Sequence, residues 1–197
     1  MKLFFLVFLF CISPVYSQTN KKLIEKIQNH IINQDFDKAI NLVEKISKKR
    51  FNYYFLKGRI FQDKKNDTEA LINYTIALQY KPNSYKTFNN IALVKGSLKD
   101  LQGALKDLNK SIEINPNYAK SYINRGVTFN VLNQPKKALK DFTNAIQINP
   151  NMSAAYVNRA ITNQYLGNKK EVCPDLNKAK ELGNKEVNSW LDILCKN

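Results

Sequence analysis

A fixed interval of 34 residues runs through the sequence and limits the folds that the chain can adopt. Pro82, Pro116 and Pro150 stand at this interval, and small and aromatic residues return around them at the same spacing. A period of this size indicates that each unit is one supersecondary element, which buries its apolar face only against its neighbours. We therefore expect function on a surface that several repeats share, and not in a single catalytic pocket.

Each unit carries small and bulky residues at fixed positions. When units begin at Phe51, Tyr85, Ala119 and Ser153, positions 8, 20 and 27 hold small residues in all cases but one. The residues at position 8 are Gly58, Ala92, Gly126 and Ala160, and those at position 24 are Tyr74, Leu108, Phe142 and Leu176. This spacing puts one apolar stripe on each of two helices. The small residues allow the two backbones to approach closely.

These residues resemble the tetratricopeptide repeat (TPR) family. The segment 122–129, which reads YINRGVTF, carries the resemblance together with the Ala138, Phe142 and Pro150 that follow it. The resemblance implies an all-α fold, a right-handed α-solenoid of helix-turn-helix repeats with a C-terminal capping helix. The repeats expected from it span about 20–50, 51–84, 85–118, 119–152 and 153–186, and the capping helix spans 187–195.

The ends of the array depart from the period. The unit at 20–50 is shorter by three residues and lacks the proline, which indicates a degenerate first repeat. At the other end, Trp190 and Leu194 occupy positions 4 and 8 of a truncated unit. Leu194 is a large side chain where a small residue belongs, and it is expected to cover the exposed end of the stack. Pro174 falls inside the expected second helix of the fifth repeat, so we expect that helix to start late, with Pro174 in its first turn.

The N-terminal residues have the pattern of a secretory signal peptide. Lys2 precedes the apolar run 3–12, and small residues lead to an expected cut before Gln18. The apolar run is shorter than the roughly 20 residues that a membrane-spanning helix needs, so a permanent anchor is the weaker alternative.

A lipid on Cys11 is another alternative to cleavage. Phe10 is bulky where a bacterial lipobox has a small residue, which argues against it. We expect residues 1–17 to be removed and residues 18–197 to form an exported TPR domain. The expected location is a periplasm or cell envelope, or the medium outside the cell.

Export changes the interpretation of the cysteines. After the cut two remain, Cys173 and Cys195, and an even count in an oxidising compartment indicates a disulfide. They lie ten residues before and twelve residues after Gly183, at corresponding heights on an antiparallel helix pair. A pair of buried free thiols is the alternative. The stretch CPDLNKAKELG followed by LDILC also resembles the C-terminal ends of exported repeat proteins from Bacteroidota-type bacteria.

The sequence contains no pattern typical of catalysis, of a cofactor or of a metal site. The single histidine, His30, lies at position 11 of the degenerate repeat, where packing is favoured over ligation. No glycine-rich phosphate loop, nucleophile elbow or paired-carboxylate pattern is present. We therefore expect no enzyme activity and no cofactor.

Two arginines occupy position 7, where the family usually has an apolar residue. Arg125 and Arg159 can each pair with the aspartate of their own repeat, Asp141 or Asp175, or with that of the preceding repeat, Asp107 or Asp141. We therefore expect structural ion pairs at these positions and not a binding site.

The family resemblance places a concave binding surface on the first helix of each repeat. The expected partner-binding residues are Arg59, Lys86, Asn89, Asn90, Lys120, Asn124, Asn130, Asn158, Gln164 and Tyr165. Asn90, Asn124 and Asn158 form a ladder at position 6, and their amides can both donate to and accept from an extended peptide backbone. Asparagine is also common at this position in the family as a whole. The implied function is a non-enzymatic module that binds a peptide or protein partner.

One subset of the family holds a terminal carboxylate with a clamp of Lys, Asn and Arg. Asn90 and Lys120 match part of that clamp, but Phe55, Arg59 and Asn124 replace its other residues. The clamp activity is therefore not expected in this chain.

Charge supports a competing function. The chain has 31 Lys and Arg against 16 Asp and Glu, a net charge of +15. Lysines near the turns of two repeats form an expected basic ridge of Lys136, Lys137, Lys140, Lys169 and Lys170. Such a ridge favours anionic envelope polymers or acidic proteins, with salt-sensitive binding. Solvated lysines are the simpler explanation, and an exported chain is not expected to meet nucleic acid.

Overall fold

The computed structural model describes residues 14–48 and 50–195. Residues 1–13 of the expected signal peptide lie outside this range, and residues 14–17 belong to the first helix. Every regular element in the described range is helical. The α-helices are α1 (Pro14–Ile32), α2 (Phe36–Val43), α3 (Phe51–Asp63), α4 (Asp67–Tyr80), α5 (Tyr85–Ser97), α6 (Leu101–Ile114), α7 (Ala119–Val131), α8 (Pro135–Ile148), α9 (Ser153–Tyr165), α10 (Lys169–Glu181) and α11 (Asn188–Leu194), and a 3-10 helix, η1 (Lys185–Val187), precedes α11.

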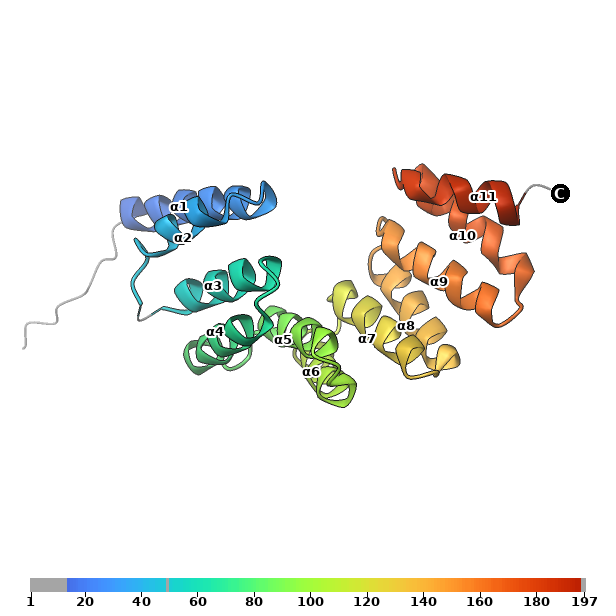
Figure 1. Cartoon of the computed structure of the whole chain (residues 1–197), viewed down its shortest axis with the longest axis horizontal. Coiled ribbons are helices and arrows are strands. Elements are labelled where there is room, and N and C mark those ends of the chain that lie inside the picture. The colour runs from blue at the N-terminus through green and yellow to red at the C-terminus, as the bar shows by residue number, and fades with distance from the viewer. Residues whose placement is uncertain (1–13, 49, 196–197) are drawn as a thin grey trace, which may run out of the picture.

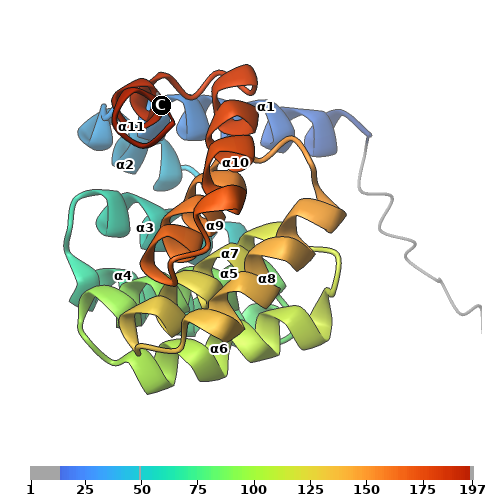
Figure 2. The ribbon, with the colours of Figure 1, turned by 90° about the vertical axis from the view of Figure 1, so that its right-hand side faces the viewer.

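The helices form pairs that follow one another along an arch (Figure 1). Helices α1 and α2 lie at one end of the arch, α10 and α11 lie at the other, and α5 and α6 lie near its middle. The first helices of consecutive pairs contact each other directly, α1 with α3, α3 with α5, α5 with α7, and α7 with α9. In Figure 2 the helix axes change direction from pair to pair, so the arch is twisted. The expected all-α solenoid is confirmed.

Positions 8 and 24 are matched in size within each repeat. A Cβ on Gly58 would come within 2.5 Å of Tyr74 Cδ1, and a Cβ on Gly126 would come within 2.6 Å of Phe142 Cε1. In the other two full repeats, position 8 is alanine and position 24 is leucine. The aromatic ring therefore fills the space that a missing methyl group leaves, and the interior stays densely packed.

One tight turn connects the two helices of each pair, and its central residue has a left-handed backbone. The φ angles are 59° at Gln34, 61° at Lys65, 67° at Lys99, 56° at Asn133 and 79° at Gly167. In the third pair, the Lys99 N–H donates to the Gly96 carbonyl at 3.1 Å and the Asp100 N–H donates to the Lys95 carbonyl at 2.9 Å. These two bonds are the Schellman pattern that ends a helix.

The same turn also starts the second helix of the pair. The Asp100 side chain accepts a hydrogen bond of 2.9 Å from the Gly103 N–H, and the Asn66 side chain accepts one of 3.2 Å from the Glu69 N–H. Both residues are the N-caps of their helices. A capping side chain satisfies a backbone donor that the helix itself leaves without a partner.

The short last helix is fixed to the array by a covalent bond and an apolar contact. Cys173 of α10 and Cys195 form a disulfide with their Cα atoms 5.7 Å apart. Leu191 and Leu194 pack on the apolar cluster between α9 and α10. Trp190, on the same helix, is 40% exposed.

Pro174 lies within a helix, and the expectation of a late helix start is wrong. Helix α10 begins at Lys169 and contains Pro174 in its interior. The start is set by the preceding turn, in which the Asn168 N–H donates to the Asn163 carbonyl at 2.9 Å. Proline has no N–H, so the helix continues past Pro174 without the bond that this residue would otherwise donate to the preceding turn.

Candidate binding groove

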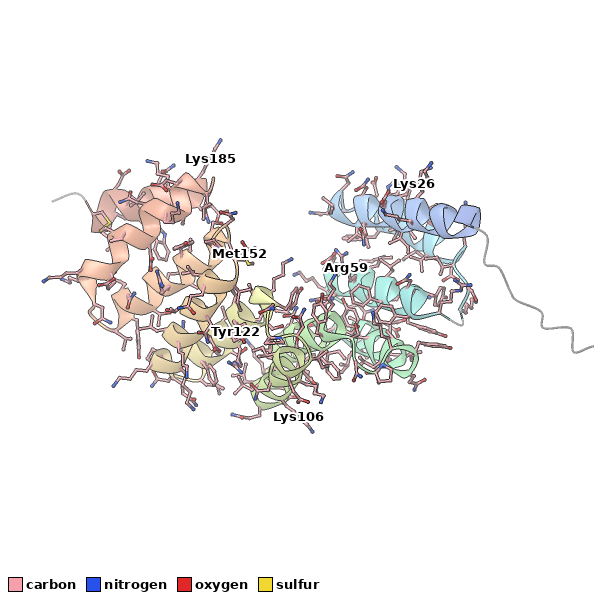
Figure 3. The ribbon with its side chains drawn as sticks, turned by 180° about the vertical axis from the view of Figure 1, so that it is seen from behind. Lys26, Arg59, Lys106, Tyr122, Met152 and Lys185 are labelled. Carbon is pink, nitrogen blue, oxygen red and sulfur yellow. A yellow bond between two sulfur atoms is a disulfide. The ribbon has the colours of Figure 1, made fainter. Side chains whose placement is uncertain are left out.

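The inner face of the arch contains a hollow of about 610 Å³. All five first helices contribute to its lining, because Gln28 lies on α1, Arg59 on α3, Asn90 on α5, Asn124 on α7 and Ala154 on α9. The full lining comprises Gln28, Phe55, Arg59, Gln62, Asp63, Lys86, Asn89, Asn90, Leu93, Tyr118, Lys120, Ile123, Asn124, Met152 and Ala154. In Figure 3, Arg59 and Met152 come from opposite arms and lie on either side of the opening. The hollow is therefore a property of the whole array and not of one repeat.

The lining of the hollow carries an excess of positive charge. Arg59, Lys86 and Lys120 contribute three cations, and Asp63 is the one carboxylate among the lining residues. Ion pairs within residues 14–48 and 50–195 involve other side chains, so these three cations have no carboxylate partner there. Cations that line a concave surface raise the local concentration of anionic groups.

Asn89, one of the predicted partner-binding residues, belongs to the lining of the first hollow but is almost fully buried. It is only 2% exposed, and its Oδ1 accepts hydrogen bonds from Asn124 Nδ2 at 2.8 Å and from Ser121 Oγ at 3.2 Å. Ser121 Oγ lies 2.6 Å from Ser111 Oγ, which donates to the Tyr85 carbonyl at 2.8 Å. Buried polar groups need such partners. Asn89 therefore holds the Asn124 side chain in place through a hydrogen bond on its buried side.

The asparagines of the position-6 ladder have three different partners. Asn90 donates to the Tyr74 hydroxyl at 3.2 Å, Asn124 donates to Asn89, and Asn158 donates to the Ala154 carbonyl at 2.8 Å. Burial raises the pKa of Tyr74, so its hydroxyl stays neutral and donates to Gln62 Oε1 at 2.7 Å. Two of the three amides are thus held by side chains of the interior, which restricts their rotamers before any ligand arrives.

A second hollow, of about 240 Å³, adjoins the first. The two share Leu93 and Asn124 as lining residues. Most of the second lining is apolar: Ala92, Leu93, Gly96, Lys99, Leu101, Leu108, Asn124, Val127, Thr128 and Val131. Leu93, Val127 and Val131 are all exposed. The groove therefore changes from a basic region to an apolar region between α5 and α7.

The remaining predicted contact residues lie further toward the C-terminal arm. Asn130 and Tyr165 line a third hollow of about 240 Å³ between α7 and α9. Asn130 Nδ2 donates to Thr162 Oγ1 at 2.7 Å, and the Tyr165 hydroxyl donates to Asn133 Oδ1 at 3.0 Å. The three hollows do not include Asn158 or Gln164. The structure therefore brings six of the ten predicted residues to the first hollow and two to the third.

Gln28, Tyr118 and Met152 are among the lining residues of the first hollow that were not predicted from the sequence. Gln28 is at position 9 of the degenerate repeat, the position that holds Arg59 in the next repeat. Applying the concave-face positions to the degenerate repeat would therefore have found it. Tyr118 and Met152 are each the last residue of a unit, just before the next first helix. This last position of a unit lies outside the first helix, so the helix positions that predict the concave face do not include it.

The predicted arginine ion pairs form within single repeats. Arg125 Nε and Nη2 each donate to an oxygen of Asp141 at 2.8 Å, and Arg159 holds Asp175 in the same two-bond arrangement. The hydrogen bond with Asp141 raises the pKa of Arg125, and that with Asp175 raises the pKa of Arg159. Both arginines are therefore structural, and the alternative pairing with the preceding repeat is excluded.

The lysines of the predicted basic ridge are all exposed at the surface of two second helices. Lys136, Lys137 and Lys140 lie on α8, and Lys169 and Lys170 start α10. Lys137 donates to Gln134 Oε1 at 2.8 Å and lies over the Phe129 ring. These contacts hold Lys137 against its own repeat.

The described part of the chain also lacks a cluster of metal ligands. Within residues 14–48 and 50–195, no three of the His, Cys, Asp and Glu side chains come together as metal ligands would. His30 Nδ1 lies 3.2 Å from Asp35 Oδ2, and their hydrogen bond lowers the pKa of Asp35. In that same range no helix combines the length and the apolar character needed to span a membrane.

Comparison with known proteins agrees with this architecture. Tetratricopeptide repeat models match residues 85–118 and 119–152, the two central repeats of the arch. The chain is a tetratricopeptide repeat protein. No curated protein sequence matches it.

Solved structures share the fold at low sequence identity. TTC0263, a thermophilic TPR protein in Thermus thermophilus, has a TM-score of 0.77 at 17% identity, over 89% of this chain and 98% of that one. PilF of Pseudomonas aeruginosa has a TM-score of 0.76 at 14% identity, over 86% of this chain and 78% of that one. YrrB, described as a TPR protein with an unusual peptide-binding site, has a TM-score of 0.63 at 18% identity, over 87% of this chain and 91% of that one. These likenesses concern the fold.

Proposed function

We propose that this TPR protein is a non-enzymatic interaction module that binds an extended segment of a partner protein in its concave groove. The observation that carries the proposal is the hollow of about 610 Å³ that all five first helices line. Its volume falls within the roughly 300–1,000 Å³ that is usual for ligand sites. Amides, cations without a carboxylate partner and apolar side chains lie side by side in it, and these groups together recognise peptides.

Binding in this groove needs little rearrangement. Asn90 and Asn124 are already held by Tyr74 and Asn89, so ordering them costs little entropy when a partner arrives. The description of YrrB as a TPR protein with a peptide-binding site supports a peptide as the ligand class. The mechanism is passive association with a preformed surface.

We also propose that the protein works outside the cytoplasm, in a periplasm or cell envelope. The disulfide between Cys173 and Cys195 supports this proposal, because disulfides persist in oxidising compartments. The apolar run at residues 3–12 supports it as well. The intact mass of the protein purified from its native source tests both points. We expect a chain that begins at Gln18 and gains two hydrogens on reduction, and a full-length reduced chain would contradict the proposal.

Selection from a phage library of random linear peptides tests the groove. The groove variant Leu93→Glu with Val127→Glu places two charges on exposed positions of the apolar region, which leaves the interior intact. The matched control is Ile72→Glu, an exposed position on the second helix α4. We expect peptides that bind the native chain and the control but not the groove variant. Circular dichroism checks that all three chains have the same helicity.

Two outcomes would contradict the proposed function. One is a selection that enriches no peptide. The other is a set of enriched peptides that bind the groove variant as tightly as the native chain. Peptides that instead lose binding when Lys136 and Lys140 are changed to Glu would assign the interaction to the basic ridge.

A further inference from the structure

We propose that the segment bound in the groove carries side-chain carboxylates next to an apolar side chain. This inference rests on the proposed function and names the chemistry of its ligand. The carboxylates occupy the first hollow, beside Arg59, Lys86 and Lys120. The apolar side chain occupies the second hollow, against Leu93 and Val127.

The charge of the first hollow selects an acidic group. Its three cations face one carboxylate, Asp63, within the same lining. The chain pairs its structural cations elsewhere: Arg125 binds Asp141, Arg159 binds Asp175, and Lys95 Nζ lies 2.7 Å from Asp107 Oδ2. Cations that have no carboxylate partner in a concave region attract anionic ligands and repel cationic ones.

The second hollow selects an apolar group. Its only polar lining residues are Lys99, Asn124 and Thr128. Leu93 and Val127 both occupy position 9 of their repeats, where the second repeat has Arg59. Position 9 therefore changes from arginine in the second repeat to aliphatic residues in the third and fourth, and this change marks the border between the basic and the apolar region. Burying an exposed leucine or phenylalanine side chain of a ligand here is favourable by the hydrophobic effect.

The two hollows are neighbours, so one short extended segment reaches both. They share Leu93 and Asn124 in their linings. An extended chain advances about 3.3 Å per residue, and alternate side chains project to opposite sides. Asn124 donates its Nδ2 hydrogen to Asn89, which leaves its Oδ1 available to accept a hydrogen bond from a backbone N–H at the border.

The acidic groups are side chains and not a chain terminus. The residues that clamp a terminal carboxylate in part of the family are only partly present, because Phe55, Arg59 and Asn124 replace them. The three cations also come from α3, α5 and α7, so they are spread across three repeats. Several carboxylates along a segment match this distribution better than one terminal group does.

The test uses a fluorescent probe peptide with the order Ser-Asp-Asp-Ser-Leu-Phe-Ser, whose ends are acetylated and amidated to remove the terminal charges. A second probe has the reverse order, since the groove does not fix the chain direction. Each probe has an Asn-Asn version without the charges and a Ser-Ser version without the apolar pair. Fluorescence anisotropy with the full chain gives the Kd of each. We expect at least one order to bind, and the loss of either feature to weaken that binding about tenfold, which corresponds to about 1.4 kcal/mol.

Variants of the chain show which hollow recognises the carboxylates of the probe and which recognises its apolar pair. Lys86→Gln with Lys120→Gln removes two of the cations, and its matched control is Lys136→Gln with Lys140→Gln on the basic ridge. We expect the first pair to abolish the preference for Asp over Asn in the probe while keeping the preference for the apolar pair. Val127→Asn is expected to do the reverse. The control pair is expected to change neither preference.

Several results would overturn the inference. They are equal binding of the Asp and Asn probes, failure of both orders to bind, or an equal loss of charge preference in the ridge control. If the phage selection enriches groove-dependent peptides without acidic residues, the proposed function stands and this inference fails. If the selection enriches no peptide, the proposed function itself fails.

Discussion

Gly126 lies directly against the ring of Phe142, so that a Cβ on Gly126 would come within 2.6 Å of Phe142 Cε1. The ring is fully buried, so any shift would disturb its packed neighbours. Gly126→Ala is therefore expected to destabilise the protein by about 1–3 kcal/mol, the usual cost of overpacking a core. Urea denaturation measures the change.

The pair can be tested as a unit by restoring the size match. Gly126→Ala combined with Phe142→Leu reproduces the alanine and leucine of the neighbouring repeats, so we expect it to be more stable than Gly126→Ala alone. Gly96 is the control glycine, because a Cβ there meets nothing within 4 Å. Gly96→Ala is expected to leave stability unchanged or to raise it by up to about 1 kcal/mol. Additive effects in the double variant would contradict the size match.

The pair of Arg125 and Asp141 is expected to stabilise the fold and not to bind a partner. Asp141→Ala leaves the Arg125 guanidinium partly buried without its two bonds, which we expect to cost about 3 kcal/mol, at the low end for broken buried pairs. Arg125→Lys keeps the charge but loses the two-bond geometry, so a smaller loss is expected. Thermal unfolding measures stability, and the probe peptide measures binding. A stable Asp141→Ala variant that no longer binds the peptide would show that the pair is functional.

The left-handed residue in the turn between α5 and α6 is a site for stabilisation. Lys99 has a φ of 67°, whereas the equivalent residue between α9 and α10 is Gly167. Glycine adopts this conformation without strain, so Lys99→Gly is expected to stabilise the protein by about 0.5–1 kcal/mol.

Asn133 provides the matched control for this change. Asparagine tolerates the left-handed region better than lysine, so Asn133→Gly is expected to gain less than Lys99→Gly. Chemical denaturation of both variants gives the comparison. A loss of stability in Lys99→Gly would mean that the lysine side chain contributes more than its backbone strain costs.

The disulfide is expected to hold α11 on the array. It closes a separation of 22 residues, for which the chain-entropy estimate gives about 3 kcal/mol. Cys173→Ser with Cys195→Ser is expected to lower stability by up to this amount and to increase hydrogen exchange in α11. Exchange in α5 and α6 serves as the internal reference and should not change. Equal exchange in α11 with and without the disulfide would show that Leu191 and Leu194 hold the helix by themselves.

Acid is expected to loosen the first repeat from the second. Burial alone would raise the pKa of Glu44, but its hydrogen bonds from Lys57 and Tyr53 outweigh burial and hold the pKa below its usual value of 4.5. A carboxylate with a lowered pKa stabilises the folded state above its unfolded pKa, and the effect is lost as the pH falls through the folded pKa. We therefore expect protection factors in α1 and α2 to fall below pH 4.5.

A neutral substitution provides the control for the acid effect. Glu44→Gln cannot titrate, so the protection of α1 and α2 should be lower at neutral pH and change less on acidification. An unchanged pH dependence in Glu44→Gln would assign the acid effect to other groups.

The sequence predicted those parts of the fold that depend on a repeating local pattern. Small residues at positions 8 and 20 and bulky residues at position 24 set the two helices of each repeat, and the structure has them there. Pro174 was misplaced because its local preference for a first turn competed with a turn at Gly167 that fixes the start of α10.

The candidate groove was harder to predict because it depends on how repeats stack. Asn89 occupies a position that the register assigns to the concave face, but the contact between α5 and α7 buries it. The division into a basic and an apolar hollow depends on side chains from three successive repeats. Such relations between repeats leave no signal in the pattern within one repeat.

The buried bonds of Asn89 join two repeats through directional contacts. Apolar side chains can slide past one another with small changes in energy, whereas a hydrogen bond weakens steeply as its angle changes. The bonds of Asn89 to Ser121 and Asn124 therefore restrict the rotation of the third repeat relative to the fourth. The neighbouring junctions also carry side-chain hydrogen bonds, from Asn90 to Tyr74 and from Asn130 to Thr162, so the arch is expected to keep its curvature through directional bonds at several successive junctions.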